Sequence, residues 1–304
     1  MEPLVLGLDV GGTASRAVVT DTEGRELGRG RAGGGNPVTV GPRRAAAQVA
    51  AAARAALAGL DPARVRAAVM GIAGAGTVDG PETAAAFQDA WEAIGLRCAV
   101  RPVGDVVVAF AAGADEPSGT VLIAGTGAAA AQIDGDRETR VGDGLGWLLG
   151  DRGSGFWIGR EAAALTAETL QSGSPPTPLT RAVAEAVTGA ETATADAFAG
   201  AVYRDPAVGL AALAPLVDRC ASVGDREALA VLDRAAGHLA RTVLAVRAGE
   251  DRGPIVLAGS VLRECRSVRQ GVRSRIAAAL PLAEVRLAAA GELGAARIAA
   301  RAVA

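Results

Sequence analysis

Short apolar runs bounded by glycine and acidic turns make up the first part of the chain. The run at 5–10 leads into Gly11-Gly12-Thr13, a second apolar and β-branched run covers 16–20, and a third extended stretch covers 26–29. Apolar runs of this length between turn residues are typical of β-strands. Two successive strands joined by a glycine turn predict a hairpin, and not the strand–turn–helix that opens a dinucleotide-binding fold.

Helical and extended patterns then alternate along the chain. Alanine-rich stretches that carry arginines predict helices, and short apolar runs between them predict buried strands. The expected helices are 42–58, 81–94 and 106–112, and the expected strands are 65–72 and 99–103. Strands and helices in this order are typical of an α/β domain.

The strand–glycine turn–strand pattern occurs a second time in the middle of the chain. Strands are expected at 120–124 and 128–133, with Gly125-Thr126-Gly127 between them. Such a duplication predicts two similar α/β domains that face each other across a central cleft. After Gly159 the chain becomes mainly helical, and the expected elements are helices 180–190, 207–222, 226–249, 266–279 and 292–303 and strands 255–258 and 284–287.

The composition excludes several kinds of catalytic chemistry. None of the 31 basic residues is a lysine, and His238 is the single histidine among the 304 residues. A Schiff-base lysine, a P-loop lysine and a zinc site built from several histidines are therefore impossible. A Ser-His-Asp relay would depend on His238 alone, which lies in an alanine- and leucine-rich stretch. We therefore expect any general base to be a carboxylate.

Charge and cysteine usage narrow the range of partners. The net charge of −2 gives no basic footprint for nucleic acid or for an anionic membrane. No apolar run approaches the ~20 residues that span a bilayer. Cys98, Cys220 and Cys265 are odd in number and far apart, which favours neither a disulfide framework nor a CxxC site. We expect a cytoplasmic protein that binds neither nucleic acid nor membrane.

The first glycine turn is a candidate phosphate site. Glycine turns leave backbone N–H groups uncovered, and these can point at phosphate oxygens. Asp9 ends the preceding strand, where a divalent cation would relieve the cost of an unpaired carboxylate. Thr13 and Ser15 add hydroxyl groups nearby. The alternative is a tight hairpin that Asp9 merely caps.

Two further places along the chain carry candidate polar groups. Asp105 follows a strand and precedes a helix, where it could act as a general base or, alternatively, as a helix N-cap. The glycine- and acid-rich run 142–155 would let backbone approach a polar ligand closely, with Asp143 and Asp151 as hydroxyl acceptors. Trp147 or Trp157 could offer that ligand an apolar face.

The motifs together resemble a known family. Leu6–Thr13, Gly104-Asp105, Gly125-Thr126-Gly127 and Leu149–Ser154 resemble the BadF/BadG/BcrA/BcrD ATPase family, and within it the N-acetylglucosamine kinases. That family belongs to the sugar kinase/Hsp70/actin superfamily. The resemblance implies an α/β fold with two ribonuclease-H-like (actin-like ATPase) domains. Residues 1–117 plus 288–304 would form the first domain, and residues 118–287 the second, with helical insertions.

The resemblance also implies a role for individual residues. ATP would be the phosphoryl donor, Mg²⁺ would be positioned by Asp9, and Asp105 would take the proton from the sugar hydroxyl. The remaining positions fall into three groups: a first phosphate motif at Gly11, Gly12 and Thr13; a second phosphate motif at Gly125, Thr126 and Gly127 with an adenosine motif at Gly259 and Ser260; and sugar-binding positions at Asn36, Gly74, Asp143, Gly144 and Asp151.

Three departures from the family pattern bear on the substrate. Ala128 stands where the second phosphate motif commonly continues with serine, and Arg152 replaces a glutamate. The segment 142–146 replaces the consecutive glycines and tryptophan of human-like N-acetylglucosamine kinases. Its extra carboxylate, Asp143, could favour the ammonium of glucosamine over an acetamide.

The expected function is transfer of the ATP γ-phosphoryl group to O6 of N-acetylglucosamine by a homodimer. Three alternatives remain open. The first is a glucosamine kinase, and the second is a nucleotide- or sugar-binding regulator that has lost turnover, which Ala128 and Arg152 would favour. The third is an activator ATPase with an iron–sulfur cluster, for which the three cysteines show no suitable local arrangement.

Overall fold

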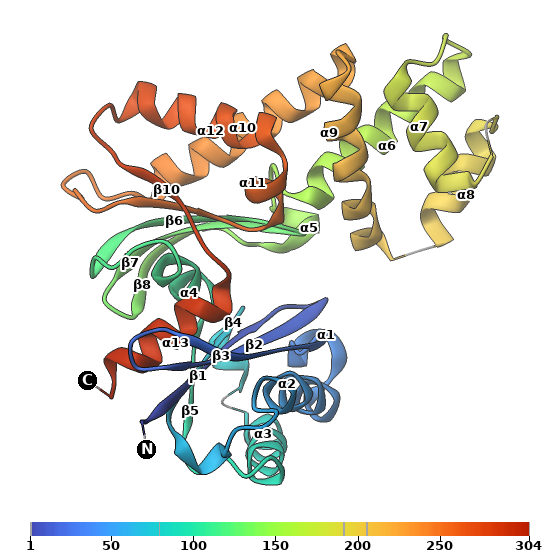
Figure 1. Cartoon of the computed structure of the whole chain (residues 1–304). Coiled ribbons are helices and arrows are strands. Elements are labelled where there is room, and N and C mark those ends of the chain that lie inside the picture. The colour runs from blue at the N-terminus through green and yellow to red at the C-terminus, as the bar shows by residue number, and fades with distance from the viewer. Residues whose placement is uncertain (1, 79, 191, 205, 304) are drawn as a thin grey trace. The chain divides into compact units, whose positions relative to one another are not determined.

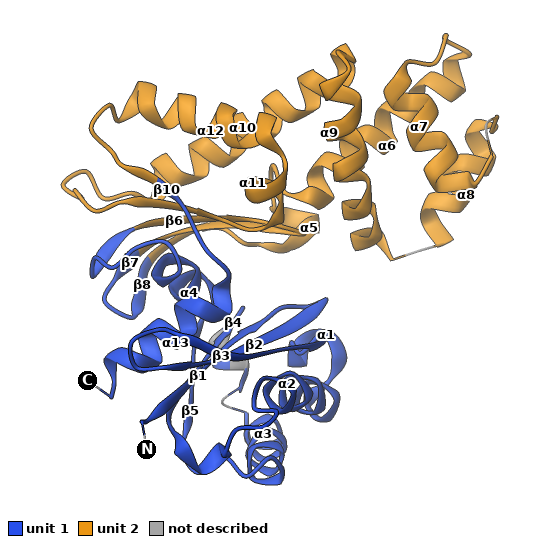
Figure 2. Cartoon of the chain, in the orientation of Figure 1, with its two compact units in different colours: residues 1–119, 133–139, 286–304 blue, residues 120–132, 140–285 orange. Residues whose placement is uncertain are grey.

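The computed structural model describes residues 2–78, 80–190, 192–204 and 206–303, apart from the side chains of residues 75 and 77. The chain forms two compact units, coloured separately in Figure 2. Unit 1 comprises Met1–Gly119, Ile133–Thr139 and Arg286–Ala304; unit 2 comprises Thr120–Gln132 and Arg140–Val285. The short segment Ile133–Thr139 packs with unit 1 although the strands on either side of it continue into unit 2.

A five-stranded sheet forms the centre of unit 1 (Figure 1). Its strand order is β3-β2-β1-β4-β5, with β2 antiparallel to β1 and β3, and with β4 parallel to β1 and β5. The expected hairpin at the N-terminus is therefore present. The strands are β1 (Leu4–Val10), β2 (Ala14–Asp21), β3 (Glu26–Gly33), β4 (Val65–Ile72) and β5 (Val100–Gly104).

Small residues let helices lie directly on both faces of this sheet. A Cβ at Gly30 would collide with the backbone of α2, and a Cβ at Gly7 would collide with the backbone of α13. The apolar side chains Leu4, Leu6 and Leu8 point to the α2 side, as strand alternation requires. The elements that surround the sheet are α1 (Pro37–Val40), α2 (Pro42–Ala56), η1 (Pro62–Arg64), η2 (Ala75–Val78), α3 (Pro81–Ala93), α4 (Asp105–Ala111) and α13 (Gly291–Arg301).

Unit 2 repeats the strand order of unit 1. Its sheet runs β10-β9-β6-β7-β8, so that within each unit the third, second, first, fourth and fifth strands lie side by side. This repetition confirms the expected α/β class with two ribonuclease-H-like halves. The strands are β6 (Ser118–Ala124), β7 (Ala128–Asp134), β8 (Arg137–Asp143), β9 (Ile255–Ala258) and β10 (Val285–Leu287).

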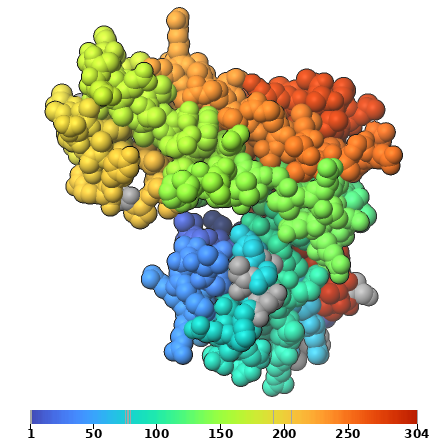
Figure 3. Space-filling model, turned by 180° about the vertical axis from the view of Figure 1, so that it is seen from behind, coloured from blue at the N-terminus to red at the C-terminus, as the bar shows by residue number. Residues whose placement is uncertain are grey.

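The helices of unit 2 form a large second layer on its sheet and an additional helical arm. Helices α7 and α8 make up an outer end of the unit in both the ribbon and the space-filling view (Figure 1, Figure 3). The helices are α5 (Gly146–Leu149), α6 (Gly155–Ser172), α7 (Pro178–Thr188), α8 (Ala195–Arg204), η3 (Ala207–Leu213), α9 (Ala214–Ser222), α10 (Arg226–Val246), α11 (Ser260–Glu264) and α12 (Arg266–Ala279).

One expectation about these elements is wrong. The single helix expected at 207–222 is a 3₁₀ segment followed by α9, and Pro215 stands in the first turn of α9. Because proline lacks an N–H group and clashes with the preceding turn, a continuous α-helix is disfavoured there. Strand β8 was not expected, because its sequence is polar and largely exposed.

The apolar face of α10 lies in the core of unit 2, where Val231, Leu239 and Val243 are fully buried. Within the described ranges no single helix is both long and apolar enough to cross a membrane. In those ranges, only two stretches taken together have the length and apolar composition of a membrane-spanning helix, namely Ala207–Ser222 and Arg226–Val246. This pair is bent by 120° at the break between them.

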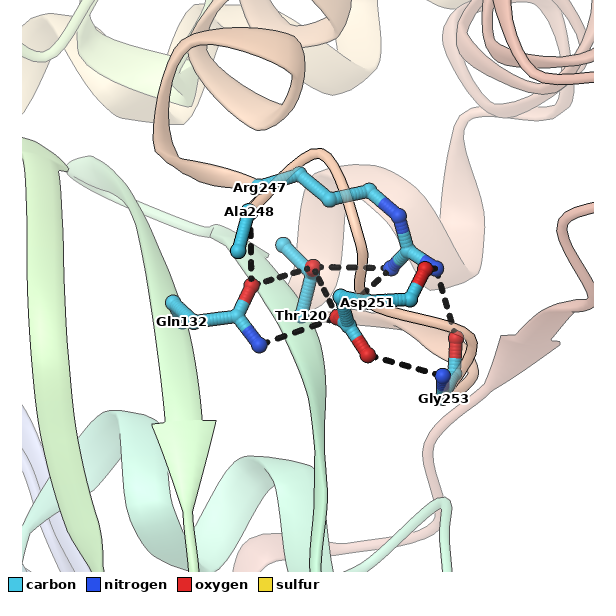
Figure 4. A network of polar contacts seen from close by, with 6 residues as sticks. All are labelled: Thr120, Gln132, Arg247, Ala248, Asp251 and Gly253. Atoms are coloured by element: carbon cyan, nitrogen blue, oxygen red, sulfur yellow. Dashed lines mark hydrogen bonds and ion pairs between the residues drawn. The ribbon is translucent and has the colours of Figure 1, made fainter.

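A buried ion pair fixes the loop between α10 and β9 to the sheet of unit 2 (Figure 4). Arg247 and Asp251 lie 3.1 Å apart, and each side chain is 6% exposed. Arg247 also donates to the hydroxyl of Thr120 at 2.9 Å, and the side-chain amide of Gln132 donates to Asp251 at 2.9 Å. Strands β6 and β7 are thus joined to the loop through charged hydrogen bonds.

We expect Arg247→Met to lower the free energy of unfolding by about 3–5 kcal/mol, because it leaves the buried Asp251 carboxylate without its cation. Urea unfolding followed by circular dichroism measures the change. The matched control is Arg275→Met, whose ion pair with Asp233 is exposed and should contribute less than about 1 kcal/mol. Equal losses in the two variants would contradict this interpretation of the network.

Candidate functional site

The candidate residues of unit 1 gather at one edge of its sheet. Val10 of β1 lies beside Ile72 of β4, and Ile72 lies beside Gly104 of β5. The carboxyl ends of these three parallel strands therefore coincide, which is where ligands bind in open α/β sheets. The first glycine turn, the loop at Gly74 and Asp105 all follow directly from these strand ends.

Asp9 is a partly exposed carboxylate beside the first turn of α13. Its carboxylate lies against Gly291, where an added Cβ would come within 2.9 Å of Oδ2. Arg16 pairs with Asp9 across the hairpin, with 3.6 Å between Nη1 and Oδ2. Helix N-termini favour negative charge. An oxygen donor in this setting suits a hard cation such as Mg²⁺, bound directly or through water.

The first glycine turn is open on its solvent side. Gly12 and Thr13 are exposed, and the N–H group of Gly11 donates to the carbonyl of Ala14 at 2.9 Å. Among the described residues, an added Cβ at Gly12 would meet nothing nearer than Thr39 Oγ1 at 3.8 Å, and the backbone there is not left-handed. The fold therefore does not require glycine at position 12. Glycine leaves room for a ligand to approach the backbone.

Ser15 does not belong to this open surface. Helices α2 and α13 both contact β2, so the start of that strand is covered on both faces. Ser15 is fully buried, and within the described part of the chain its hydroxyl has no hydrogen-bond partner. We therefore leave Ser15 out of the candidate phosphate site.

Asn36 joins the loop after β3 to the loop after β4. Its side-chain oxygen accepts from the N–H of Val38 at 3.0 Å and so caps α1. Its amide nitrogen donates to the carbonyl of Ala73 at 3.3 Å, next to Gly74. The structure thus brings Asn36 and Gly74 together beside the first turn, and contact with a sugar remains a prediction for both.

Asp105 does not act as a helix N-cap. The N-cap of α4 is Gly104, and the Asp105 carboxylate accepts from the N–H of Val106 at 3.0 Å. Burial raises the pKa of Asp105, and the nearby Glu138 carboxylate raises it further to a smaller degree. An added Cβ at Gly104 would come within 2.9 Å of Glu138 Oε2, so this second carboxylate lies directly over the preceding residue.

A raised pKa predicts a pH dependence if Asp105 is a general base. The carboxylate is then fully deprotonated only at a higher pH than an ordinary aspartate needs, because its pKa is higher. We expect Glu138→Gln to move the acid limb of kcat/KM to lower pH, because it removes a like charge. Asp136→Asn is the control, since Asp136 lies in the same hairpin but pairs with Arg101 at 2.7 Å. An acid limb that stays in place in Glu138→Gln would contradict the assignment.

The second glycine turn, in unit 2, resembles the first. The N–H of Gly125 donates to the carbonyl of Gly127 at 2.9 Å, and Thr126 is exposed. An added Cβ at Gly125 would meet nothing nearer than Ser260 Oγ at 3.7 Å. Here too the fold does not require the glycine. Gly127 differs, because a Cβ there would come within 2.9 Å of the Asp151 carboxylate.

Asp143 and Asp151 fix the loop between β8 and α6. Both adopt left-handed backbone conformations, with φ of 60° and 56°. The carboxylate of Asp143 accepts from the N–H of Asp151 at 2.6 Å and of Arg152 at 3.0 Å, and that of Asp151 accepts from the N–H of Ala128 at 3.0 Å. Burial and the charge of Asp143 raise the pKa of Asp151. Two backbone donors already engage Asp143, which weakens the expectation that it selects an ammonium group.

The loop held by Asp143 and Asp151 presents apolar side chains to solvent. Gly144 is exposed, with φ of +72°, and its N–H donates to the carbonyl of Ala128 at 3.0 Å. Trp147 is 43% exposed and contacts Phe156, so it offers an apolar face in this loop. Trp157 does not, because it is buried and packs edge-on against His238, with 5.0 Å between ring centroids.

Gly259 and Ser260 lie next to the second turn. Gly259 has φ of +93°, and an added Cβ would collide with the backbone of Ala124. The glycine is therefore required for β9 to enter α11 beside β6. Ser260 is the first residue of α11 and borders a cavity.

This cavity lies wholly within unit 2 and has a volume of about 290 Å³. Its size approaches the lower end of small-ligand pockets. The cavity could not be predicted from the sequence, because its walls combine helices that are far apart in the chain. The lining residues come from the second turn (Gly125, Thr126), α6 (Gly155, Ile158), η3 and α9 (Ala211, Ala214, Pro215, Asp218, Arg219), and α11 and its end (Ser260, Val261, Glu264, Cys265).

Comparison with known proteins gives a family match and similar folds. Residues 6–299 match the BadF/BadG/BcrA/BcrD ATPase family. A search of curated proteins returned no match. A provisionally assigned N-acetylglucosamine kinase from Chromobacterium violaceum has a TM-score of 0.77 at 24% identity, with 98% of this chain and 99% of that chain covered.

Two further solved structures share the fold. A provisionally assigned N-acetylglucosamine kinase from Porphyromonas gingivalis has a TM-score of 0.75 at 23% identity, covering 99% of this chain and 100% of that chain. A ROK family glucokinase from Streptomyces griseus, solved with glucose and AMPPNP, has a TM-score of 0.62 at 20% identity, covering 97% and 98%. At these identities the similarity establishes the fold alone.

Proposed function

Because the chain belongs to the BadF/BadG/BcrA/BcrD ATPase family, as its motifs led us to expect, we propose that it is an ATP-dependent sugar kinase. The acceptor in this proposal is O6 of an amino sugar, with N-acetylglucosamine preferred. The observation that carries the proposal is the pair of open glycine turns, one in each unit, at positions where the fold itself does not need glycine. Open backbone N–H groups of this kind suit phosphate oxygens.

Binding of the nucleotide is supported by the surroundings of the second turn. Gly125 and Thr126 are among the residues that line the 290 Å³ cavity, so a phosphate chain at the turn would leave its nucleoside beside the cavity. The cavity walls are largely apolar, as a purine ring requires. In this proposal each of the two turns is a phosphate-binding site.

The residues of unit 1 supply the rest of the reaction. Asp105 would orient the sugar hydroxyl and accept its proton as the hydroxyl oxygen attacks the γ-phosphorus and the bond to the β-phosphate oxygen breaks. Mg²⁺ held by Asp9, directly or through water, supplies positive charge to the phosphate oxygens. Phosphoryl transfer needs mainly positioning and charge stabilisation, which backbone amides and arginine provide without any lysine.

The sugar as acceptor is supported by the fold neighbours and by the exposed loop beside the first turn. Three similar structures carry names of sugar kinases. Asn36 and Gly74, which lie together in unit 1, would offer hydrogen bonds to a pyranose ring. The cytoplasmic location and the homodimer remain part of the proposal.

A coupled ADP-release assay with N-acetylglucosamine, glucosamine, glucose and N-acetylmannosamine tests the function. We expect ADP release to depend on the sugar and to be fastest with N-acetylglucosamine, and the 6-deoxy analogue to be inactive. Fastest turnover with glucosamine would correct the substrate but keep the kinase. ADP release without any sugar, or none with all four, would contradict the proposal and favour an activator ATPase or a regulator.

A further inference from the structure

The cavity of unit 2 contains a carboxylate that is held in place from within the protein. Asp218 of α9 lines the cavity, and its Oδ1 accepts a hydrogen bond from the thiol of Cys265, with 2.9 Å between sulfur and oxygen. Cys265 is buried, and burial together with Asp218 raises the pKa of its thiol to about 12. The thiol therefore keeps its proton at neutral pH and donates it toward Asp218.

The other charged residues of the cavity are less constrained. Glu264 and Arg219 also line it, but both side chains are exposed, whereas Asp218 is half-buried. A carboxylate only accepts hydrogen bonds, so a ligand that satisfies it must present a donor. A fixed acceptor of this kind discriminates between ligands, because a ligand without the donor forgoes the hydrogen bond that the carboxylate offers.

We propose that Asp218 is a specificity-determining residue that selects a nucleoside carrying a hydrogen-bond donor at this wall. The inference rests on the proposed function, because it takes the cavity beside the second glycine turn as the nucleoside site. Two parts of adenosine offer such donors, namely the ribose hydroxyl groups and the amino group of adenine. A nucleotide that lacks whichever of these donors faces Asp218 would bind poorly.

Calorimetric titration of the purified full chain with four nucleotides tests the inference without requiring turnover. The probes are ATP, 2′-deoxyATP, 3′-deoxyATP and inosine triphosphate, each with Mg²⁺. We expect at least one analogue to bind about tenfold or more weakly than ATP. In Asp218→Asn, ATP should bind less than about threefold more tightly than that analogue. A single charge-assisted hydrogen bond to Asp218 accounts for the difference in affinity in the wild type. The analogue that loses affinity identifies the ribose or the base as the partner.

The outcomes separate this inference from the kinase proposal. Glu168→Gln, an exposed carboxylate of α6 outside the cavity, is the charge-matched control and should keep the wild-type ratios. If ATP binds and the ratios are the same in wild type and Asp218→Asn, the role of Asp218 is refuted while the kinase stands. If wild type binds none of the four nucleotides, the proposed function itself fails and this inference fails with it.

Discussion

Replacing Asp105 by asparagine is expected to lower kcat by about 10²–10⁴-fold, because a general base contributes that much to proton transfer. The same change is expected to raise the melting temperature at neutral pH. Both effects follow from one feature, a partly buried carboxylate next to Glu138 whose pKa is raised. ADP-release kinetics and thermal unfolding measure them on the same sample.

The sign of the stability effect depends on pH. Because folding raises the pKa of Asp105, the charged carboxylate destabilises the folded state, fully so above the folded pKa. Asparagine removes that penalty at neutral pH. Below about pH 3, which is under the pKa of an aspartate in the unfolded chain, Asp105 is protonated in both the folded and the unfolded state. The melting temperatures of wild type and Asp105→Asn should then be equal.

The exposed Asp89 on α3 provides the control, since Asp89→Asn should change neither kcat nor melting temperature. A variant Asp105→Asn that keeps more than about a tenth of the wild-type kcat would remove Asp105 from the role of base. A lower melting temperature at every pH would instead show that the carboxylate is a structural requirement.

Gly12→Ala and Gly125→Ala are each expected to lower kcat/KM for ATP by about 10²–10³-fold while leaving the fold intact. That loss is typical when one backbone donor to a developing charge is displaced. Neither methyl group meets a neighbour closer than 3.7 Å, so unfolding free energies should stay equal or rise by up to about 1 kcal/mol. Steady-state kinetics and urea unfolding measure both quantities.

Substitutions at two other glycines serve as controls, one expected to be tolerated and one expected to destabilise the fold. Gly200 lies within α8, and no described atom lies within 4 Å of the place of its missing Cβ, so Gly200→Ala should stabilise the protein slightly and leave kcat/KM unchanged. Gly294 packs against the carbonyl of Val108, so Gly294→Ala should destabilise strongly. Normal kinetics in Gly12→Ala and Gly125→Ala would mean that these turns do not hold phosphate.

The sequence was informative where local pattern and local structure agree. Both glycine turns lie between apolar strands, and each is an open hairpin bend in the structure. Asp105 follows β5 directly, so its position at the sheet edge could be predicted from chain order. Strands β1 and β6 are nearly all buried, which explains why their apolar runs were clear signals.

The sequence was uninformative where tertiary packing decides. Ser15 is next to an exposed turn in the chain, yet helices on both faces of β2 bury it. Strand β8 forms through pairing with β7 although its side chains are polar, and it brings Glu138 to Asp105. The carboxylate of Asp143 closes its own loop, a role that left-handed aspartates do not reveal in sequence, and its contact with a ligand stays a prediction.

A crystal structure of the protein with AMPPNP, Mg²⁺ and N-acetylglucosamine is the most direct test of the proposal that both glycine turns bind phosphate. We expect backbone N–H groups of residues 11–13, and likewise of residues 125–127, within hydrogen-bond distance of phosphate oxygens, with the sugar O6 near Asp105. A bound nucleotide whose phosphates receive hydrogen bonds from neither turn, or from only one of them, would contradict it.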